Sequence, residues 1–253
     1  MQKIRAWFED FGNMIFFAGE TLAWMLRPPF RPELVIVQMA AIGVGSTFII
    51  STTGFFTGVV LALQTNYAMH QLGAEGYVGA TVAVGLAREL GPVLTSLFLV
   101  GRSGSAISTE LGTMRVTEQI DAMETMAVSP IQYLVVPRLV ASLAMFPLLT
   151  MLFNFVGYVG AYMMSIVLAE IPAGPFIEHT RELLDVPDIL HGLFKAIIFG
   201  GVVALITCWR GFAATGGAKG VGEGTTRAVV TSSIAILLVD TAFVLVTVGA
   251  GKR

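Results

Sequence analysis

The stretch LVIVQMAAIGVGSTFIISTTGFFTGVVLALQ, residues 34–64, decides the fold class of this chain. It contains no Asp, Glu, Lys or Arg, and the uncharged run continues to residue 74. An α-helix needs about 20 mostly apolar residues to cross roughly 30 Å of hydrocarbon, and this stretch is longer than that. We therefore expect a first membrane-spanning helix within residues 34–64.

Further stretches of the same character follow along the chain. The whole sequence is 55% hydrophobic and only 13% charged, whereas soluble domains carry about 25% charged residues. The pattern predicts an all-α integral membrane protein with five transmembrane helices, at residues 34–64, 77–101, 139–169, 189–209 and 228–249. We expect residues 102–138 to be too polar to cross, and the glycine-rich residues 211–226 to form a flexible loop.

Residues 1–33 differ in character from the rest, which we expect to form a single membrane domain over residues 34–253. Apolar residues recur at near-helical spacing over residues 1–26, with Trp7 and Trp24 near the ends. This pattern is typical of an amphipathic interfacial helix with its indoles at headgroup depth. An amphipathic helix packed on protein is the alternative. The sequence RPPFRP at residues 27–32 then makes an elbow, because successive prolines cannot continue a helix.

The basic residues are distributed unequally between the two sides of the membrane. With a cytoplasmic N-terminus, the outer segments hold only Arg181 and the terminal Lys252 and Arg253. By the positive-inside rule this places the C-terminus in the periplasm. The inner segments then hold Lys3, Arg5, Arg27, Arg31, Arg102, Arg115, Arg138, Arg210, Lys219 and Arg227.

Several classes of function find no support in the sequence. The net charge is −2 without a basic stripe, which argues against a nucleic-acid partner. The three histidines and Cys208 lack ligand-like spacing, so no metal site is expected. Lys219 is followed by Gly220 and not by Ser or Thr, so residues 211–226 contain no phosphate-binding loop. We expect a chain that is not an enzyme and holds no cofactor of its own.

Ionisable residues inside the expected spans are functional candidates, because a charge in hydrocarbon is costly unless it faces protein or a wet cavity. Arg88 and Glu89 lie about halfway along the second span, and either an anionic group in a cavity or an ion pair to a neighbouring helix would explain them. Lys195 lies about two turns inside the fourth span, where we expect its long stem to reach the headgroups. For Asp240 a helix–helix hydrogen bond is the first expectation and a proton relay the second.

The polar segment 102–138 contains a short amphipathic helix at residues 117–127. Thr117 is placed to cap its N-terminus, and Pro130 follows its end. Held between two spans, such a helix is shaped to dock in a partner's groove, although a connector lying on the surface is an equal alternative. The side chains expected to make the docking contacts are Glu118, Gln119, Asp121, Met123, Glu124 and Met126.

Four motifs resemble one known family. The sequences are ARELGPV at 87–93, GRSGSAISTELGTM at 101–114, TEQIDAMETMAVSP at 117–130 and PRLVA at 137–141. Together they resemble the MlaE (YrbE-type) permeases of ABC transporters, which move phospholipids and other lipids with MCE-domain partners. The resemblance covers residues 34–249. The EAA-x-x-x-G motif of classical importers is not evident, so contacts from that class are not carried over.

The resemblance implies a homodimer in the inner membrane that moves phospholipid between that membrane and an MCE protein. ATP and Mg²⁺ would be bound by partner ATPase subunits (MlaF-like), docked on the coupling helix at 117–127. An MCE-domain (MlaD-like) hexamer would sit on the outer face, with a small STAS-type (MlaB-like) subunit as a further partner. A short extracytoplasmic helix is implied at residues 173–185.

The same resemblance implies a lipid cavity formed between the two subunits. Arg88 and Glu89 would form its polar part, with Lys195 near the mouth. Its acyl-chain wall would be made of Leu61, Ala68, Leu72 and Leu90. Two other hypotheses compete with lipid transport: an ion- or proton-coupled transporter that uses Arg88, Glu89 and Asp240, and a membrane scaffold without transport.

Overall fold

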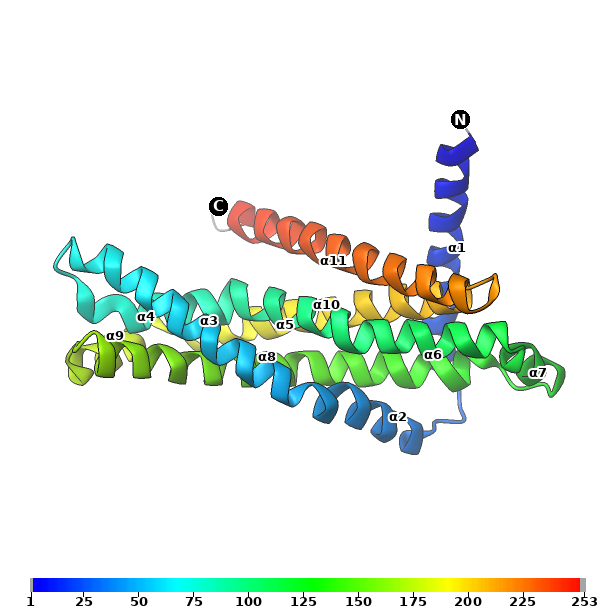
Figure 1. Ribbon diagram of the computed structural model, residues 1–253, viewed down its shortest axis with the longest axis horizontal. Coiled ribbons are helices and arrows are strands. Elements are labelled where there is room, and N and C mark those ends of the chain that lie inside the picture. Colours follow the sequence, from blue (N-terminus) through cyan, green and yellow to red (C-terminus); the bar gives the residue numbers. More distant parts are fainter. Residues whose placement is uncertain (1, 251–253) are drawn as a thin grey trace.

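The computed structural model describes residues 2–250, with side chains over residues 9–247 except residue 11, and the described chain is helical without a strand. Long helices run side by side along one axis, while the N-terminal helix stands across them (Figure 1). The elements are α1 (Gln2–Met25), α2 (Pro32–Met39), η1 (Ala40–Val44), α3 (Gly45–His70), η2 (Glu75–Tyr77), α4 (Val78–Gly85), η3 (Leu86–Leu90), α5 (Gly91–Leu99), η4 (Val100–Gly104), α6 (Ser105–Val116), α7 (Gln119–Thr125), η5 (Ile131–Val135), α8 (Val136–Met163), η6 (Met164–Leu168), α9 (Ala173–Leu183), α10 (Val186–Phe212) and α11 (Gly217–Ala250).

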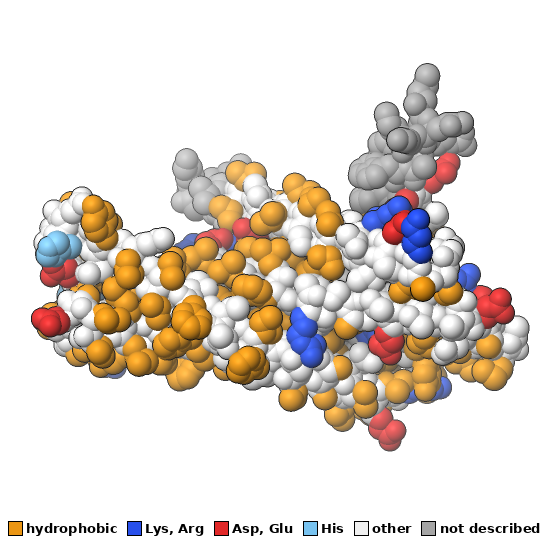
Figure 2. Space-filling view, viewed as in Figure 1, with side chains coloured by type: hydrophobic (Ala, Val, Ile, Leu, Met, Phe, Trp, Pro, Cys, Tyr) orange, Lys and Arg blue, Asp and Glu red, His pale blue; other side chains and the backbone are white. Residues whose placement is uncertain are grey.

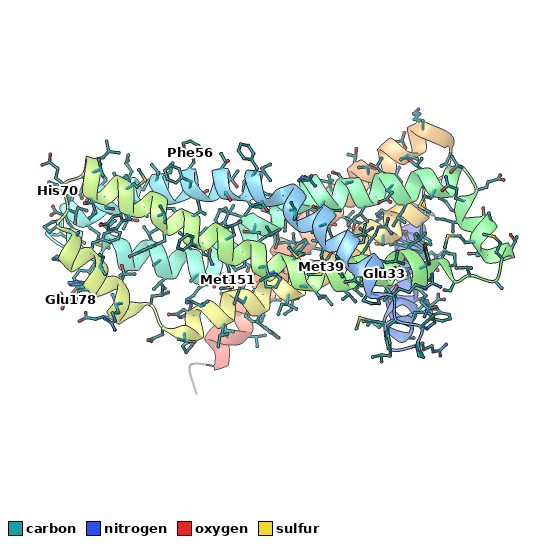
Figure 3. All side chains as sticks on the ribbon, turned by 90° about the horizontal axis from the view of Figure 1, so that it is seen from below. Glu33, Met39, Phe56, His70, Met151 and Glu178 are labelled. Carbon is teal, nitrogen blue, oxygen red and sulfur yellow. The ribbon has the colours of Figure 1, made fainter. Side chains whose placement is uncertain are left out.

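The five predicted spans are confirmed in number, and each is longer than expected. Within the described residues, the helices long and apolar enough to cross a membrane run over Pro32–His70, Glu75–Val116, Ile131–Leu168, Val186–Phe212 and Gly217–Thr247. Figure 3 places His70 and Glu178 at one end of the bundle and Glu33 near the other. The α7 end and the α9 end are therefore the two poles of the molecule.

Two expectations about the polar segments were wrong. Residues 102–116 continue the second helix, because Ile107 and Leu111 are buried while polar side chains occupy the opposite face. Most of the expected loop at 211–226 is helical, since α11 begins at Gly217. A β-carbon added to Gly112 would lie 3.3 Å from Val221 Cγ1, so α11 packs closely on α6 here. This tertiary contact stabilises a helix in a glycine-rich sequence of low helix propensity.

The first and third spans cross closely through glycines. A β-carbon added to Gly58 would lie 1.8 Å from the carbonyl oxygen of Gly157, and one added to Gly160 would lie 2.4 Å from that of Phe55. Small residues permit such backbone approach between membrane helices. The small residues Gly54, Gly58, Gly157 and Gly160 therefore serve packing within this chain.

Five segments of π-helix interrupt the spans: η1, η3, η4, η5 and η6. A π-turn inserts a residue into the helix, changes the direction of the side chains that follow it, and is frequent at functional sites. Arg88 and Glu89 lie in η3, and Arg102 lies in η4. Arg88, Glu89 and Arg102 thus lie on π-turns, whereas Lys195 and Asp240 lie in regular α-helix.

Helix α1 is fixed to the end of α10 by polar and aromatic contacts. Asp10 accepts a hydrogen bond of 2.7 Å from Arg210 Nη1 and one of 3.2 Å from Trp209 Nε1. The Phe17 ring is 5.5 Å from that of Trp209. The opposite side is apolar and exposed, with 80% of Phe16 accessible. One face of α1 therefore packs on protein while the other suits a membrane interface.

Candidate functional site

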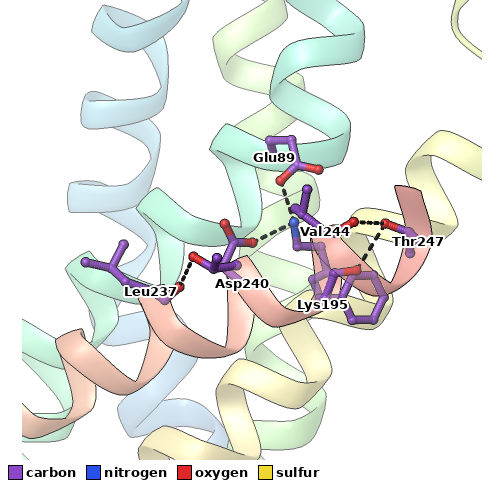
Figure 4. A network of polar contacts seen from close by, with 8 residues as sticks. Glu89, Lys195, Leu237, Asp240, Val244 and Thr247 are labelled. Carbon is purple, nitrogen blue, oxygen red and sulfur yellow. Dashed lines mark hydrogen bonds and ion pairs between the residues drawn. The ribbon is translucent and has the colours of Figure 1, made fainter. Parts of the chain in front are cut away.

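Lys195 is the centre of an ion cluster that joins three spans. Its side chain is fully buried, and Nζ lies 2.5 Å from Glu89 Oε2 and 2.6 Å from Asp240 Oδ1 (Figure 4). The contact with Glu89 has hydrogen-bond geometry, whereas that with Asp240 lacks the alignment of a hydrogen bond. Nζ also lies 5.7 Å from the centre of the Phe243 ring.

Burial explains why this lysine has two anionic neighbours. An ammonium group out of water is very costly unless opposite charges and hydrogen bonds compensate it. Glu89 and Asp240 are 41% and 21% exposed, so each carboxylate keeps a part of its surface outside the cluster. The cluster contains one cation, Lys195, and two anions, Glu89 and Asp240. Because only the two carboxylates are exposed, the accessible side of the cluster is negative.

The expectation that Lys195 reaches the headgroups was wrong. Its side chain points to η3 and α11, where the carboxylates of Glu89 and Asp240 hold the ammonium group inside the bundle. The contact also gives Asp240 a partner on a neighbouring helix, but through an ion pair and not through the hydrogen bond that was expected. The sequence of the fourth span alone does not predict the buried position of Lys195, because its partners Glu89 and Asp240 lie in the second and fifth spans.

Arg88 does not pair with Glu89 but with an aspartate of α10, at a different position of the helix that also holds Lys195. Arg88 Nη1 lies 2.9 Å from Asp188 Oδ1, in the first turn of α10. Asp188 also accepts a hydrogen bond from the backbone N–H of Asp185, within a capping box that starts this helix. The Arg88 side chain is nevertheless 46% exposed. A guanidinium group held in place on one side and open on the other can still bind an anion.

The residues expected to line an acyl-chain path are less buried than a closed pocket would make them. Leu61 packs against the core, whereas 76% of Leu72 and 37% of Leu90 are exposed, and Ala68 is exposed too. They lie on the outer part of the first span, just beyond it, and in η3 of the second. Figure 2 shows hydrophobic side chains over α3 and α11 on one face of the molecule.

A cavity of about 540 Å³ lies elsewhere, between α4, α8, α9 and the start of α10. It holds none of the seven expected lipid-contacting residues. Its lining is mostly apolar and consists of Ala83, Ala87, Met151, Asn154, Phe155, Tyr158, Ile177, Thr180, Arg181, Leu184 and Ile189. Figure 3 labels Met151 on α8, along this wall.

The expected coupling helix is present as α7 at the pole opposite α9. It begins after Glu118, whose backbone is left-handed with φ of 60°. Thr117 does not cap it, because its hydroxyl donates to the carbonyl of Thr113 at 2.8 Å. Ile120 is buried, and Asp121 pairs with Arg115 of α6. These two contacts fix α7 to the second span.

The outward side of α7 carries the exposed acidic side chains of Glu118 and Glu124 and the flexible side chain of Met126. Of the expected docking residues, Asp121 and Met123 are partly buried, and the others are exposed: Glu118, Gln119, Glu124 and Met126. A cavity of about 520 Å³ lies beside it, between α6 and the start of α11, lined by Thr109, Thr113, Val116, Thr117, Ala218, Val221, Gly222 and Thr225.

This chain matches a known protein family over α7 and nearly all of the described spans. The family described as Permease MlaE matches residues 35–246, which include the described spans and α7. The chain belongs to the MlaE permease family. The match to this family starts just after the elbow, so α1 lies outside the matched residues.

Named relatives cover nearly all of this MlaE-family chain. The intermembrane phospholipid transport system permease protein MlaE of Haemophilus influenzae is 36% identical, over 96% of this chain and 95% of the relative. A probable ABC transporter permease protein of Rickettsia conorii is 38% identical, over 91% and 89%. The chloroplastic protein TRIGALACTOSYLDIACYLGLYCEROL 1 of Arabidopsis thaliana is 35% identical, over 88% and 64%.

Proposed function

We propose that this chain is the transmembrane subunit of an ABC transporter that moves phospholipid between the inner membrane and an MCE-protein partner. The family match supports the permease role, and the names of the relatives support ABC-type transport of phospholipid. In this proposal the chain carries no ATP chemistry itself. Partner ATPase subunits bind ATP and Mg²⁺ and drive the cycle.

The observation that carries the lipid proposal is the half-exposed Arg88 beside a buried ion cluster. Asp188 orients its guanidinium group, and Leu90, two residues further along η3, adds exposed apolar surface. A planar guanidinium group matches the oxygens of a phosphate, and apolar side chains match acyl chains. Arg88 and Glu89 therefore form the polar part of the lipid site, with Leu61, Ala68, Leu72 and Leu90 along the chains.

Lys195 takes a different role in this proposal from the one first expected. Since its ammonium group is fully buried by Glu89 and Asp240, it acts as an internal link that positions Glu89. The same pairing disfavours the ion-coupled alternative, because a proton relay through Asp240 would have to break a contact that compensates a buried charge.

Helix α7 is proposed as the contact for the ATPase on the cytoplasmic side. Its exposed Glu118 and Glu124 suit a basic groove, and Met126 offers an adaptable apolar contact. The N-terminus then lies in the cytoplasm and the C-terminus in the periplasm. A homodimer, an MCE-domain (MlaD-like) hexamer and a small STAS-type (MlaB-like) subunit complete the assembly.

The test is to purify the tagged chain gently from its own host and to measure ATP hydrolysis and phospholipid transfer in the co-purified material. Glu124→Arg should lower the co-purified ATPase activity by about 10-fold, because a reversed charge opposes a complementary surface. Glu182→Arg is the matched control, since Glu182 is exposed on α9 at the other pole. Wild-type material that moves phospholipid without any ATPase would overturn the proposal.

A further inference from the structure

Arg102 is an exposed arginine inside the second span. It lies in η4, and Nη1 donates one long hydrogen bond of 3.5 Å to the carbonyl of Ala41 in η1. A β-carbon added to Gly45 would lie 2.5 Å from Arg102 Nη2, so this glycine leaves room for the guanidinium group on the first span. Among the described residues, no carboxylate forms an ion pair with Arg102.

The position of Arg102 is well inside the membrane-crossing part of the bundle. At 1.5 Å per residue it lies about 12 Å along the helix from Glu110, which pairs with Arg138 nearer the α7 pole. Ala41, which it contacts, is about 15 Å along the first span from Arg31 at the elbow. A phospholipid resting in the cytoplasmic leaflet keeps its phosphate nearer the water than this.

The surroundings of Arg102 form a partly exposed strip along the second span. Leu90, Gly101, Ala106 and Thr109 are exposed on this strip, with half-buried apolar residues between them. The first span borders it through Gly45, and α11 packs against η4 and α6 on its other side. Both borders are apolar toward the outside, as shown by Val44, Phe48, Ile234 and Leu238.

An arginine here has a charge that nothing in the described chain compensates. An ionised side chain in hydrocarbon is costly, and such residues mark substrate paths, wet cavities or partner groups. A single long bond to a carbonyl leaves most of the five guanidinium N–H donors open. Gly45 and the carbonyl of Ala41 place the guanidinium group next to the first span, and the rest of the group remains exposed.

We propose that Arg102 binds the phosphate of a phospholipid in transit, at a site about 21 Å along the second span from Arg88. This inference rests on the proposed function and deepens it, because it gives the lipid path a second cation on the cytoplasmic half. The phosphate meets Arg102 only after it has left the headgroup layer. The acyl chains then lie against the apolar borders of α3 and α11.

The first test measures phospholipid transfer by the whole co-purified complex in vesicles of phosphatidylethanolamine and phosphatidylglycerol. Arg102→Gln should slow transfer by about 10-fold or more, as for the loss of a charge-assisted hydrogen bond. Arg102→Lys should restore part of the rate, since it keeps the charge but not the planar fork. Arg227→Gln is the control, because Arg227 is 70% exposed near the α7 pole and pairs only weakly with Glu223.

The second test asks directly for the phosphate. A photoreactive amino acid in place of Ala106, one turn from Arg102, should label phospholipid more strongly than diacylglycerol with the same acyl chains. Adding Arg102→Gln should abolish this preference. Equal labelling of the two lipids in the presence of Arg102 would overturn the inference.

Three outcomes separate this inference from the proposed function. Unchanged transfer by Arg102→Gln overturns the role of Arg102 alone. A change in subunit number in native mass spectrometry, seen in both Arg102 variants, also overturns it and makes Arg102 a contact between subunits. If the wild-type complex moves no phospholipid, the proposed function itself fails, whatever the labelling at position 106 shows.

Discussion

Lys195 Nζ lies 2.6 Å from Asp240 Oδ1 and thereby joins the fourth span to the fifth. Only 11% of the apolar part of the fifth span is buried within this chain, against 44% for the fourth. Because Lys195 also contacts Glu89, the second span is tied to the same point. Movement of the second span at the proposed lipid site would therefore act on α11 through one buried ammonium group.

Replacement of Lys195 by methionine should destabilise the protein, because it leaves two carboxylates without their counter-charge. We expect a loss of about 3 kcal/mol, at the low end for a broken buried pair since both carboxylates are partly exposed. This loss of stability is measured by thermal unfolding in detergent, monitored as the amount of protein that stays soluble on heating. Lys219→Met, at an exposed position, is the control.

The triple change Lys195→Met, Glu89→Gln and Asp240→Asn distinguishes charge from packing. It should recover much of the stability lost in Lys195→Met, because no unpaired charge remains in the bundle. If the triple variant is no more stable than the single one, the cluster stabilises the helices through packing and not through charge.

Gly58→Ala should disturb the crossing of the first and third spans. The added β-carbon would meet the backbone of Gly157 at 1.8 Å, and backbone atoms cannot move aside as a side chain can. We expect a destabilisation of about 1–3 kcal/mol. Gly85→Ala is a matched control in a membrane helix, because a β-carbon there meets nothing within 4 Å. Equal melting temperatures for the two variants would contradict this account of the crossing.

Asp10→Ala should loosen α1 from the bundle without unfolding the spans. The change removes the ion pair with Arg210 and the hydrogen bond from Trp209, together worth about 1–2 kcal/mol in a partly exposed place. Faster hydrogen exchange over residues 12–25, with unchanged exchange in α8, is the expected result. Glu20→Ala should have a smaller effect, because among the described side chains Glu20 accepts a hydrogen bond from Trp24 of the same helix and none from another helix.

Ile120→Ala should free α7 from the second span. Ile120 is 1% exposed, and truncation of a buried isoleucine costs about 2–4 kcal/mol, here as local opening of a short helix. Hydrogen exchange over residues 117–126 should rise, and ATPase retention should fall with it. Met126→Ala, at a position 68% exposed, should leave the exchange of α7 unchanged. Protection of α7 in the Ile120 variant would show that Asp121 and Arg115 suffice to hold it.

The number of spans and the position of α7 follow from the sequence because both are local properties. Hydropathy over about 20 residues reports whether a helix can cross hydrocarbon, whatever its neighbours are. The apolar spacing of residues 118–126 and Pro130 likewise mark a short helix without knowledge of its contacts. The helix ends were less predictable: Ile107, Leu111 and Val221 extend spans into polar sequence only because other helices cover them.

The partners of the intramembrane charges required the tertiary structure. Lys195 and Glu89 are 106 positions apart in the chain, and Arg88 and Asp188 are 100 apart, so no local pattern relates them. The neighbours Arg88 and Glu89 even turn to different partners, because successive helical side chains point about 100° apart and η3 alters that spacing further. Arg102 is a further residue whose surroundings could not be predicted from the sequence. Its sequence placed it in a polar connection, and only the packing of Ala41 and Gly45 against it shows an open guanidinium group inside the membrane.

The sequence alone determined that this protein crosses the membrane five times and carries rare charges in its spans. Tertiary packing decided which charges compensate one another and which remain open to a ligand, because compensation depends on distances between helices that hydropathy does not encode.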